Sequence, residues 1–412
     1  MHHRSVLNRI APPRLGTSFR WLMASTWVNN IGDGIALAAG PLLVASQTDN
    51  AVLVALGGLL QRVPWLVLGL YAGALADRVD RRRMIMVADA LRAVVLVVLG
   101  AIIVSGHVNI TAVLSAMLLL GVAEVFVDSA SQTMLPMVVD HEDLGIGNAR
   151  LAGGFLVGNQ VVGPPLGAFL FAAGMALPFF GQAVLVALAI VLIAQIATPK
   201  GPPRELADTH ILRDIGEGIR WVWHNDAVRT LALIIVVFNV TFGAAWSVLV
   251  LYALDHLHMT EVGFGLLSTS AAVGGLLSTA LYGRIERRFD LGNVMRGVLL
   301  LEVLAHLSFA LATTGYVAMV IMFVFGAYSF VWFAVSQTVR QRATPMDLQG
   351  RVGSVYMVGV FGGIVVGQAL GGVIAERWGL TAPFWFAFIG SGITLALVWR
   401  QLSSIAHAKA PE

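Results

Sequence analysis

The sequence predicts an all-α membrane protein with twelve transmembrane helices in two pseudo-symmetric six-helix bundles, with both chain termini cytoplasmic. Three observations lead to this prediction. The chain of 412 residues is 58% hydrophobic and only 12% charged, whereas soluble domains carry about 25% charged residues. The apolar residues occur in blocks of about 20, the length that crosses a bilayer. Short fragments of the first half also recur in the second half at a nearly constant spacing.

Twelve apolar segments are long enough to cross the membrane as helices, and they lack the alternation typical of membrane barrels. The expected spans are residues 19–46, 52–76, 84–105, 110–134, 150–172, 176–197, 228–254, 261–283, 293–313, 316–338, 351–375 and 381–400. Residues 1–18 are basic but lead directly into a span that is too long for a signal-peptide core. We therefore expect this segment to be retained.

The positions of the cationic residues predict the orientation. Of 26 Lys and Arg residues, only Arg377 falls in an expected exterior loop, and only Arg62 and Arg92 fall inside spans. The others lie in the N-terminal segment, in inner loops or at inner helix ends, which is the distribution typical of cytoplasmic sides. The expected parts are an N-terminal segment (1–18), an N-terminal bundle (19–197), a cytoplasmic linker (198–227), a C-terminal bundle (228–400) and a cytoplasmic tail (401–412).

The linker contains apolar residues at helical spacing, among them Ile211, Ile215 and Ile219, interleaved with charged residues. This pattern is typical of an amphipathic helix that lies on a membrane surface, here the inner one. A simple tether between the two bundles is the alternative.

Several function classes are excluded by what the sequence lacks. There are no cysteines, so disulfides, zinc–thiolate sites and iron–sulfur centres are absent. The two lysines, Lys200 and Lys409, do not follow glycine as a Walker A loop requires, and no HExxH metal motif is present. The cations punctuate apolar runs instead of gathering on one face, which argues against a nucleic-acid partner. We expect no enzyme activity, no cofactor and no metal.

Three fragments of the first half recur in the second half in the same order. The sequence from Arg78 to Arg82 resembles that from Arg284 to Arg288, and Ser131-Gln132-Thr133 recurs as Ser336-Gln337-Thr338. In the fifth and eleventh spans, Gly163-Pro-Pro-Leu-Gly167 corresponds to Gly367-Gln-Ala-Leu-Gly371. Two related bundles suggest a midplane cavity between them that is exposed alternately to either side.

Two motifs identify a family resemblance. The sequence from Gly73 to Arg83, with Asp77, Arg78 and Arg81, resembles the loop 2–3 signature of the major facilitator superfamily. The motif of the fifth span resembles that of the drug:proton antiporters within this superfamily; its residues are Gly158, Gly163, Pro164, Pro165 and Gly167. The similarity is greatest to the branch of bacterial multidrug, macrolide and enterobactin exporters. It implies the twelve-helix major facilitator fold in the inner membrane.

The resemblance also implies a latch at the inward gate. Asp77 would meet the N-terminal dipole of the eleventh span near Arg351, and Arg81 would reach Asp128 at the end of the fourth span. Arg78, Arg82 and Arg83 are expected to serve as simple anchors on the cytoplasmic side. The sequence departs from the family pattern in two places, with Asp80 where the loop signature has glycine and Ala168 for the second glycine position of the fifth span.

Two charged residues are expected at the same depth in neighbouring helices. Asp33 and Arg62 each lie 14 residues from an inner helix end, or about 21 Å along the axis. We expect them to form a pair, or to share a polar cluster with Gln61, Asn29 and Asn30. Since charges in the membrane are costly, each needs a partner or a function. The pair is either a static salt bridge or a site where Asp33 takes up a proton.

A second charged group is expected lower in the same bundle. Asp89 and Arg92 are three residues apart, and Glu124 and Asp128 are four apart, so each pair shares a helix face. Arg92 is the single cation there for three carboxylates. Because like charges repel strongly in a low dielectric, one of these acids is expected to exchange a proton near neutral pH. Glu124, the deepest, is the first candidate, and a structural partner of Arg92 is its alternative role.

The second half carries few charges within its spans. Glu302 and His306 lie one turn apart in the ninth span, as either a second proton site or a satisfied polar pair. Residues that could line a substrate cavity are Asn239 and Trp246 in the seventh span, Glu302 and His306 themselves, and Phe330, Trp332 and Phe333 in the tenth span. Lipid-facing or packing roles are the alternative for these side chains.

The leading functional hypothesis is a secondary transporter that exports amphiphilic, drug-like small molecules by proton antiport with alternating access. The expected partners are this small-molecule substrate, protons and membrane lipids, and we expect the protein to be a monomer. A second hypothesis keeps the fold but changes the cargo to an endogenous siderophore or lysophospholipid. A third is a membrane scaffold or sensor that transports nothing, against which the lack of a soluble domain argues.

Overall fold

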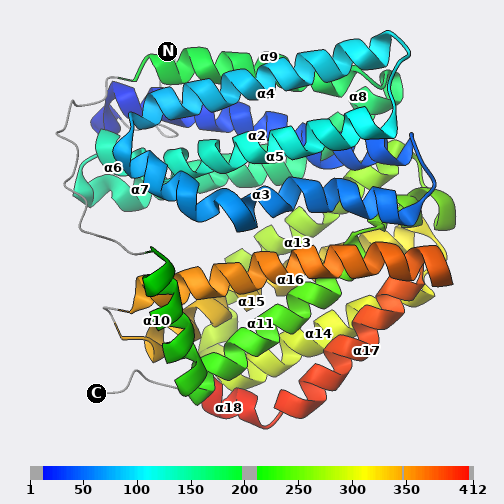
Figure 1. The fold of residues 1–412 in the computed structure, drawn as a ribbon. Coiled ribbons are helices and arrows are strands. Elements are labelled where there is room, and N and C mark those ends of the chain that lie inside the picture. Colours follow the sequence, from blue (N-terminus) through cyan, green and yellow to red (C-terminus); the bar gives the residue numbers. More distant parts are fainter. Residues whose placement is uncertain (1–12, 197–210, 346–347, 408–412) are drawn as a thin grey trace. The chain divides into compact units, whose positions relative to one another are not determined.

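The structure is a computed structural model that describes residues 13–196, 211–345 and 348–407. This part of the chain consists of helices joined by short connections and contains no strand (Figure 1). Within these residues, eleven helical segments are long and apolar enough to cross a membrane, and Ala382–Val398 is a shorter apolar helix. The predicted all-α membrane fold is confirmed. The beginning of the expected N-terminal segment, the first part of the linker and the end of the tail lie outside the described residues.

The third and fourth spans each begin at a polar residue whose side chain caps the helix. Asp80 accepts a hydrogen bond from the backbone N–H of Arg83 at the start of α4, and Asn109 accepts one from Ala112 at the start of α5. Asp80, which departs from the family signature, therefore has a structural role.

The helices of this half are η1 (Pro13–Leu15), α2 (Gly16–Ala45), α3 (Ala51–Arg78), α4 (Arg81–Val104), α5 (Ile110–Ser131), α6 (Leu135–Val138), η2 (His141–Asp143), α7 (Leu144–Gly154), η3 (Phe155–Val162), α8 (Gly163–Ala173) and α9 (Leu177–Ala194).

The fifth span, formed by α7, η3 and α8, changes its helical type within the membrane. Proline has no backbone N–H, so Pro164 and Pro165 cannot donate to carbonyls one turn earlier. The prolines instead occupy the first turn of α8, where no intrahelical donor is needed, and the segment just before them, η3, is a π-helix. The prolines therefore coincide with an interruption of the α-helix, in a form that often marks functional positions.

The second half contains one helix before its first span and one after its last. The helices are α10 (Ile211–His224), α11 (Asp226–Trp246), α12 (Leu249–Leu251), η4 (Tyr252–His256), α13 (Glu261–Arg288), α14 (Leu291–Leu311), α15 (Gly315–Ala343), α16 (Gln349–Trp378), α17 (Ala382–Val398) and α18 (Gln401–Ala406). The expected seventh span, 228–254, is not one continuous helix, because it breaks after Trp246.

A helix is present in the linker, as expected. One side of α10 packs on its own half of the chain, where Val222 is buried and Glu217 forms an ion pair with Arg351 at 2.8 Å. Ile219 and Trp223 remain exposed on its other side. The location of α10 on a membrane surface stays a prediction.

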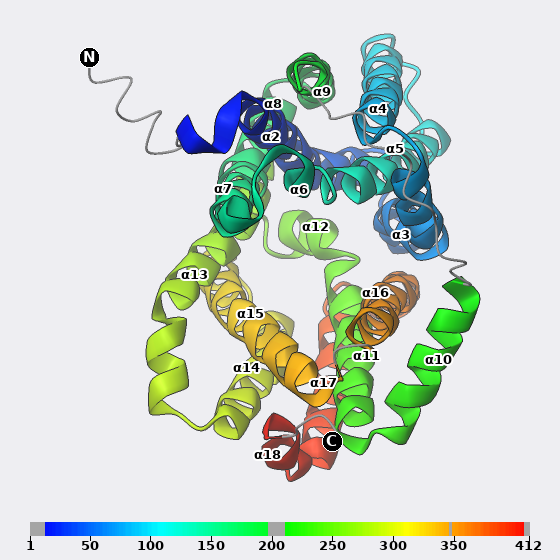
Figure 2. The same ribbon diagram turned by 90° about the vertical axis from the view of Figure 1, so that its left-hand side faces the viewer.

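The two halves repeat the same packing between helices. In the first half, α2 packs on α8 and α9, and α4 packs on α5 and α9. In the second half, α11 packs on α16 and α17, and α14 packs on α15 and α17 (Figure 2). Glycines allow the equivalent close contacts, because a Cβ at Gly163 would lie 2.4 Å from the Cα of Gly34, and one at Gly367 would lie 2.2 Å from the carbonyl oxygen of Val240. The internal repeat read from the sequence is therefore present in the fold.

Contacts divide the chain into two compact units, unit 1 (Met1–Gln47 and Leu60–Leu206) and unit 2 (Thr48–Leu59 and Ala207–Glu412). The first turns of α3 belong to unit 2. There the backbone N–H of Ala51 donates to Oε2 of Glu376 on α16 at 2.8 Å. A Cβ at Gly372 would lie 2.7 Å from the Cβ of Ala55, so this crossing requires glycine.

Candidate functional site

A buried guanidinium lies at the centre of unit 1. Arg92, on α4, is 3% exposed and forms ion pairs with Asp33 of α2 and with Asp89, whose Oδ1 lies 3.0 Å from Nη1. Nη1 also donates to Oδ1 of Asn29 on α2 at 3.2 Å. Asp89 lies one helical turn before Arg92 on the same face. Because a buried charge is stable only when it is paired and hydrogen-bonded, these contacts hold α2 and α4 in one arrangement.

Two further carboxylates approach this centre from α5. Glu124 and Asp128 are one turn apart and half-buried, and both interact electrostatically with Arg92 and Asp33. A cavity of about 70 Å³ lies beside Glu124; its other polar lining residues are Asp33, Gln61, Arg62, Arg92, Asn159 and Gln182. This volume holds a few water molecules, whereas a drug-sized ligand needs about 300–1,000 Å³. The cavity therefore suits water and protons.

The expected direct pairing of Asp33 with Arg62 is wrong. Asp33 pairs with Arg92, while Arg62 lines the same cavity and acts electrostatically on Glu124. Counting residues from helix ends puts Asp33 level with Arg62, but it takes no account of the reach of a long arginine side chain. The alternative expectation, a shared polar cluster that includes Gln61, agrees with the structure.

Two polar residues of this cavity were missed from the sequence. Asn159 in η3 and Gln182 in α9 line it, and both are less than a tenth exposed. Gln182 is a single amide in an apolar stretch, and Asn159 with its neighbour Gln160 forms an amide pair in another. Amides within apolar stretches are the sequence signal that identifies them. Of the two expected asparagines on α2, Asn29 contacts Arg92, whereas Asn30 donates to the carbonyl of its own helix at Thr26.

The glycines of the fifth-span motif pack directly against the segment of α2 that carries Asp33. A Cβ at Gly163 would lie 2.4 Å from the Cα of Gly34, and one at Gly167 would lie 2.2 Å from the carbonyl oxygen of Ile35. Real side chains do not approach this closely, so the contact depends on hydrogen atoms in place of methyl groups. The motif therefore fixes the backbone next to Asp33 and the π-helical segment that carries Asn159 into the cavity.

The loop 2–3 motif is built into the end of unit 1. Arg82, expected as a simple anchor, donates to the carbonyl oxygens of Ala194 at 3.3 Å and Ile196 at 2.7 Å, where cations stabilise the end of α9. Nη1 of Arg81 donates to the sulfur of Met137 at 3.1 Å. The side chain of Asp77 lies outside the described part, so the gate latch stays a prediction.

Three of the expected cavity residues meet in unit 2. The rings of Trp246 and His306 meet edge to face with centroids 6.1 Å apart, and Nε2 of His306 lies 3.8 Å from Oε1 of Glu302. Both Glu302 and His306 are buried. Asn239 donates to a carbonyl of its own helix, and Trp332 joins no ring contact of this cluster in the described part of the chain.

Metal binding has no geometric support in the described part of the chain. No group of three or more His, Asp or Glu side chains there is arranged to hold an ion. The acids of unit 1 instead surround a guanidinium.

Comparison with known proteins then gives the family. Residues 8–409 match the model of the transmembrane secretion effectors, which are major facilitator proteins. The chain belongs to this family. It is therefore a multi-pass transporter of the bacterial inner membrane.

The curated relatives of this family member are efflux proteins. Multidrug efflux pump Tap of Mycolicibacterium fortuitum is 28% identical over 380 residues, covering 86% of this chain and 88% of that protein. Macrolide efflux protein A of Streptococcus pyogenes is 23% identical, with 94% and 96% covered. Enterobactin exporter EntS of Shigella boydii is 24% identical, with 98% and 96% covered.

Solved structures agree on the fold of this family member. A bacterial homologue of the iron transporter ferroportin in its inward-facing state superimposes with a TM-score of 0.77 at 17% identity, covering 94% of this chain and 98% of that one. Nucleoside transporter NupG superimposes with a TM-score of 0.70 at 14% identity, covering 96% and 100%. At these identities the likeness establishes the major facilitator fold alone.

Proposed function

We propose that this protein exports amphiphilic, drug-like small molecules across the inner membrane by proton antiport with alternating access. The observation that carries the proposal is the centre of unit 1, where the buried Arg92 is shared by Asp33 and Asp89 and is approached by Glu124 and Asp128. Such a group at membrane depth is costly and is typical of ion-coupled transporters.

The balance of charges favours reversible protonation. Four carboxylates gather around Arg92, and Arg62 at the cavity wall is the second cation that acts on Glu124. Carboxylates in excess over cations in a low dielectric repel one another, which favours the binding of a proton by one of them. The small polar cavity beside Glu124 gives water a place from which that proton is exchanged.

Glu124 is the proposed proton carrier, with Asp33, Asp89 and Asp128 as its partners in the coupled group. When Glu124 loses its proton, it competes with Asp33 for the guanidinium of Arg92. Any change in the Asp33–Arg92 contact moves α2, which is locked to the fifth span through glycines. Protonation is thereby coupled to the packing of helices within unit 1.

The proposed cargo class rests on the relatives and on cavity size. The chain is similar to pumps named for multidrug and macrolide efflux. The cavity in unit 1 is too small for such molecules, so proton and cargo occupy different places. The aromatic cluster around Trp246 in unit 2, where Phe242 stacks on both Trp246 and Phe325, is the proposed cargo contact.

The test is dye efflux, measured as transport of dye into everted membrane vesicles with an imposed proton gradient. Glu124→Gln should abolish gradient-driven efflux and retain dye binding, because the amide keeps the shape of the side chain and cannot ionise. Glu142→Gln, at an exposed carboxylate between α6 and α7, is the matched control and should pump normally. Undiminished, protonophore-sensitive efflux by Glu124→Gln would remove Glu124 from the mechanism.

A second candidate function keeps the mechanism and changes the cargo. The likeness to an enterobactin exporter over 98% of the chain favours an endogenous siderophore. In the same vesicles, a catecholate siderophore that moves against its gradient while dyes do not would establish this alternative. If neither moves, the transport proposal itself fails.

A further inference from the structure

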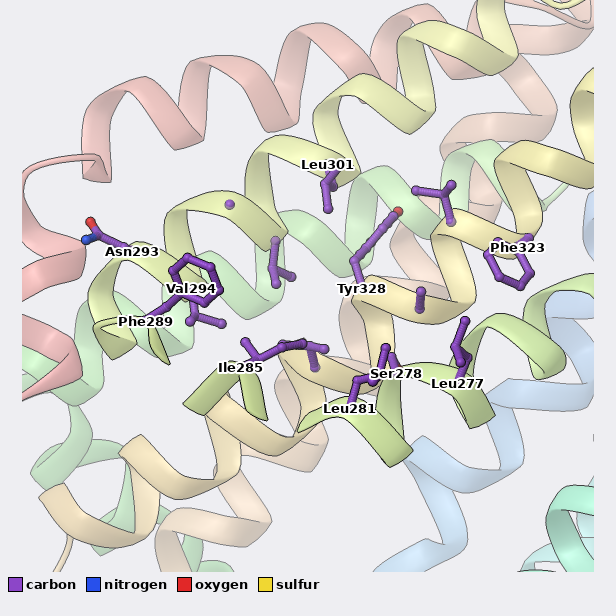
Figure 3. Close-up of a pocket in the computed structure, with 15 residues that line it drawn as sticks. Leu277, Ser278, Leu281, Ile285, Phe289, Asn293, Val294, Leu301, Phe323 and Tyr328 are labelled. Carbon is purple, nitrogen blue, oxygen red and sulfur yellow. The ribbon is translucent and has the colours of Figure 1, made fainter. Parts of the chain in front are cut away.

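An apolar groove of about 400 Å³ lies in unit 2 (Figure 3). It borders the aromatic cluster, because the ring of its lining residue Tyr328 meets that of Phe325 edge to face. It is formed by three helices, with α13 and α14 as its walls and α15 at its base. Prominent lining residues are Leu277, Leu281, Ile285, Leu301, Phe323 and Tyr328. None of the residues proposed to contact cargo or protons lines it.

The groove offers almost no polar contact along its length. Among the described lining residues, the hydroxyl of Ser278 already donates to the carbonyl of Gly275 at 2.9 Å. The hydroxyl of Tyr328 is buried, and the amide of Asn293 lies at the end where α13 gives way to α14. The walls therefore suit a hydrocarbon chain.

Cations flank the groove at that same end. On α13, Arg284 and Arg288 are both exposed. They lie one turn beyond the lining residues Leu281 and Ile285, on one flank of the helix face that lines the groove. Helical geometry places Glu286 on the opposite flank and Arg287 on the far side of the helix. The other acid nearby, Asp290, is already engaged, because it caps α14 and its Oδ1 lies 3.1 Å from Nε2 of His407.

The length of the groove matches one leaflet of a bilayer. From Leu277 to Phe289 the groove follows α13 for twelve residues, or about 18 Å at 1.5 Å per residue. Half of a hydrocarbon core of about 30 Å is about 15 Å. The end with the arginines therefore reaches the headgroups of the leaflet that the sequence predicts to be cytoplasmic, and the end near Phe323 reaches the bilayer middle.

We propose that this groove binds an anionic phospholipid, with one acyl chain between α13 and α14 and the phosphate held by Arg284, Arg288 and Asn293. An acyl chain is as apolar in the bilayer as in the groove, so burial alone does not select a lipid. Shape complementarity keeps the chain in place, and the arginines select a negative headgroup. The proposal depends on the membrane location and not on the exported cargo.

Two glycines provide a matched pair of variants for the test. A Cβ at Gly297, which lines the groove, meets nothing within 4 Å, so Gly297→Phe fills the groove without a backbone clash. A Cβ at Gly283 also meets nothing within 4 Å, but Gly283 does not line the groove. Gly283→Phe is therefore the control for a bulky residue at a membrane surface. Arg287→Gln is the corresponding control for Arg284→Gln and Arg288→Gln.

The assay is native mass spectrometry of protein released from nanodiscs that contain equal amounts of phosphatidylcholine and phosphatidylglycerol. Wild type, Gly283→Phe and Arg287→Gln should each retain one phosphatidylglycerol, and Gly297→Phe should lose it. Preference for phosphatidylglycerol should fall about fivefold for each flanking arginine removed. Retention of the lipid by Gly297→Phe, unchanged preference without both arginines, or displacement of the lipid by a transported dye would overturn the proposal. Unchanged thermal unfolding shows that each variant is folded.

Discussion

A single methyl group at Gly163 tests the contact between the fifth-span motif and the charged centre. In Gly163→Ala, the new Cβ would lie 2.4 Å from the Cα of Gly34 and 2.7 Å from the carbonyl oxygen of Gly158. Carbon atoms pack best at about 3.5–4.0 Å, so α2 and α8 must separate by about 1 Å. Overpacking of this kind costs about 1–3 kcal/mol, which lowers Tm by about 2–12 °C for a unit of this size.

The same separation should reduce transport beyond its effect on stability. Gly34 follows Asp33 directly, so displacement of α2 disturbs the contact between Asp33 and Arg92. We expect gradient-driven dye efflux in everted vesicles to fall severalfold at temperatures where Gly163→Ala is still fully folded. Thermal unfolding of the purified protein in nanodiscs, followed by circular dichroism, gives Tm for comparison.

Two other glycine variants control for helix position and for the repeat. Gly153→Ala, in α7 of the same span, adds a Cβ that meets nothing within 4 Å and should leave Tm and efflux unchanged. Gly367→Ala adds a Cβ 2.2 Å from the carbonyl oxygen of Val240 and should lower Tm as Gly163→Ala does. If Gly163→Ala has the Tm and the efflux rate of wild type, the reasoning from close packing to coupling is refuted.

Three further predictions concern the charged and capping residues of unit 1, with the loss of stability measured as Tm of the purified protein. Arg92→Gln leaves the buried Asp89 and the half-buried Asp33 without their cation and should cost about 3–5 kcal/mol; adding Asp89→Asn should restore part of this, and a double variant no more stable than the single would contradict the pairing. Asp80→Ala removes the cap of α4 and should cost about 0.5–2 kcal/mol, whereas Asp80→Asn should retain most of the stability. Arg82→Gln removes the charged donor at the end of α9 and should cost about 1.5–3 kcal/mol; an unchanged Tm would mean that these carbonyls are satisfied by water.

Much of the fold can be predicted from the sequence, because each membrane span is a continuous apolar stretch of sufficient length. The apolar block at 84–105 becomes α4 at Arg81–Val104, and the block at 110–134 becomes α5 at Ile110–Ser131. The start of α4, three residues before the apolar block begins, is set by the cap at Asp80, and the hydrophobic pattern alone does not locate it. The break of the seventh span after Trp246 is missed for a related reason, because its sequence remains apolar through the change of backbone geometry.

The candidate site is predictable within one helix and less so between helices. The shared faces of Asp89 with Arg92 and of Glu124 with Asp128 follow from helical spacing alone. The Asp33–Arg92 pair depends on which helices pack together and on how far the arginine side chain extends. A hydropathy profile shows neither. The groove in unit 2 is likewise invisible in the sequence, because its residues resemble any other lipid-facing surface.

The two halves pack their helices in the same way but differ in the residue at one equivalent buried position. Arg92 is the twelfth residue of α4, and Glu302 is the twelfth residue of α14. Each of these helices packs on the fourth and last spans of its own half, so the two residues occupy equivalent places in the repeat. In unit 1 the place holds a cation surrounded by acids, and in unit 2 it holds an acid beside His306 and an aromatic cluster. Identical proton chemistry in both halves is therefore not expected. In the proposed function, duplication with divergence assigns the proton to one half and contact with an apolar cargo to the other.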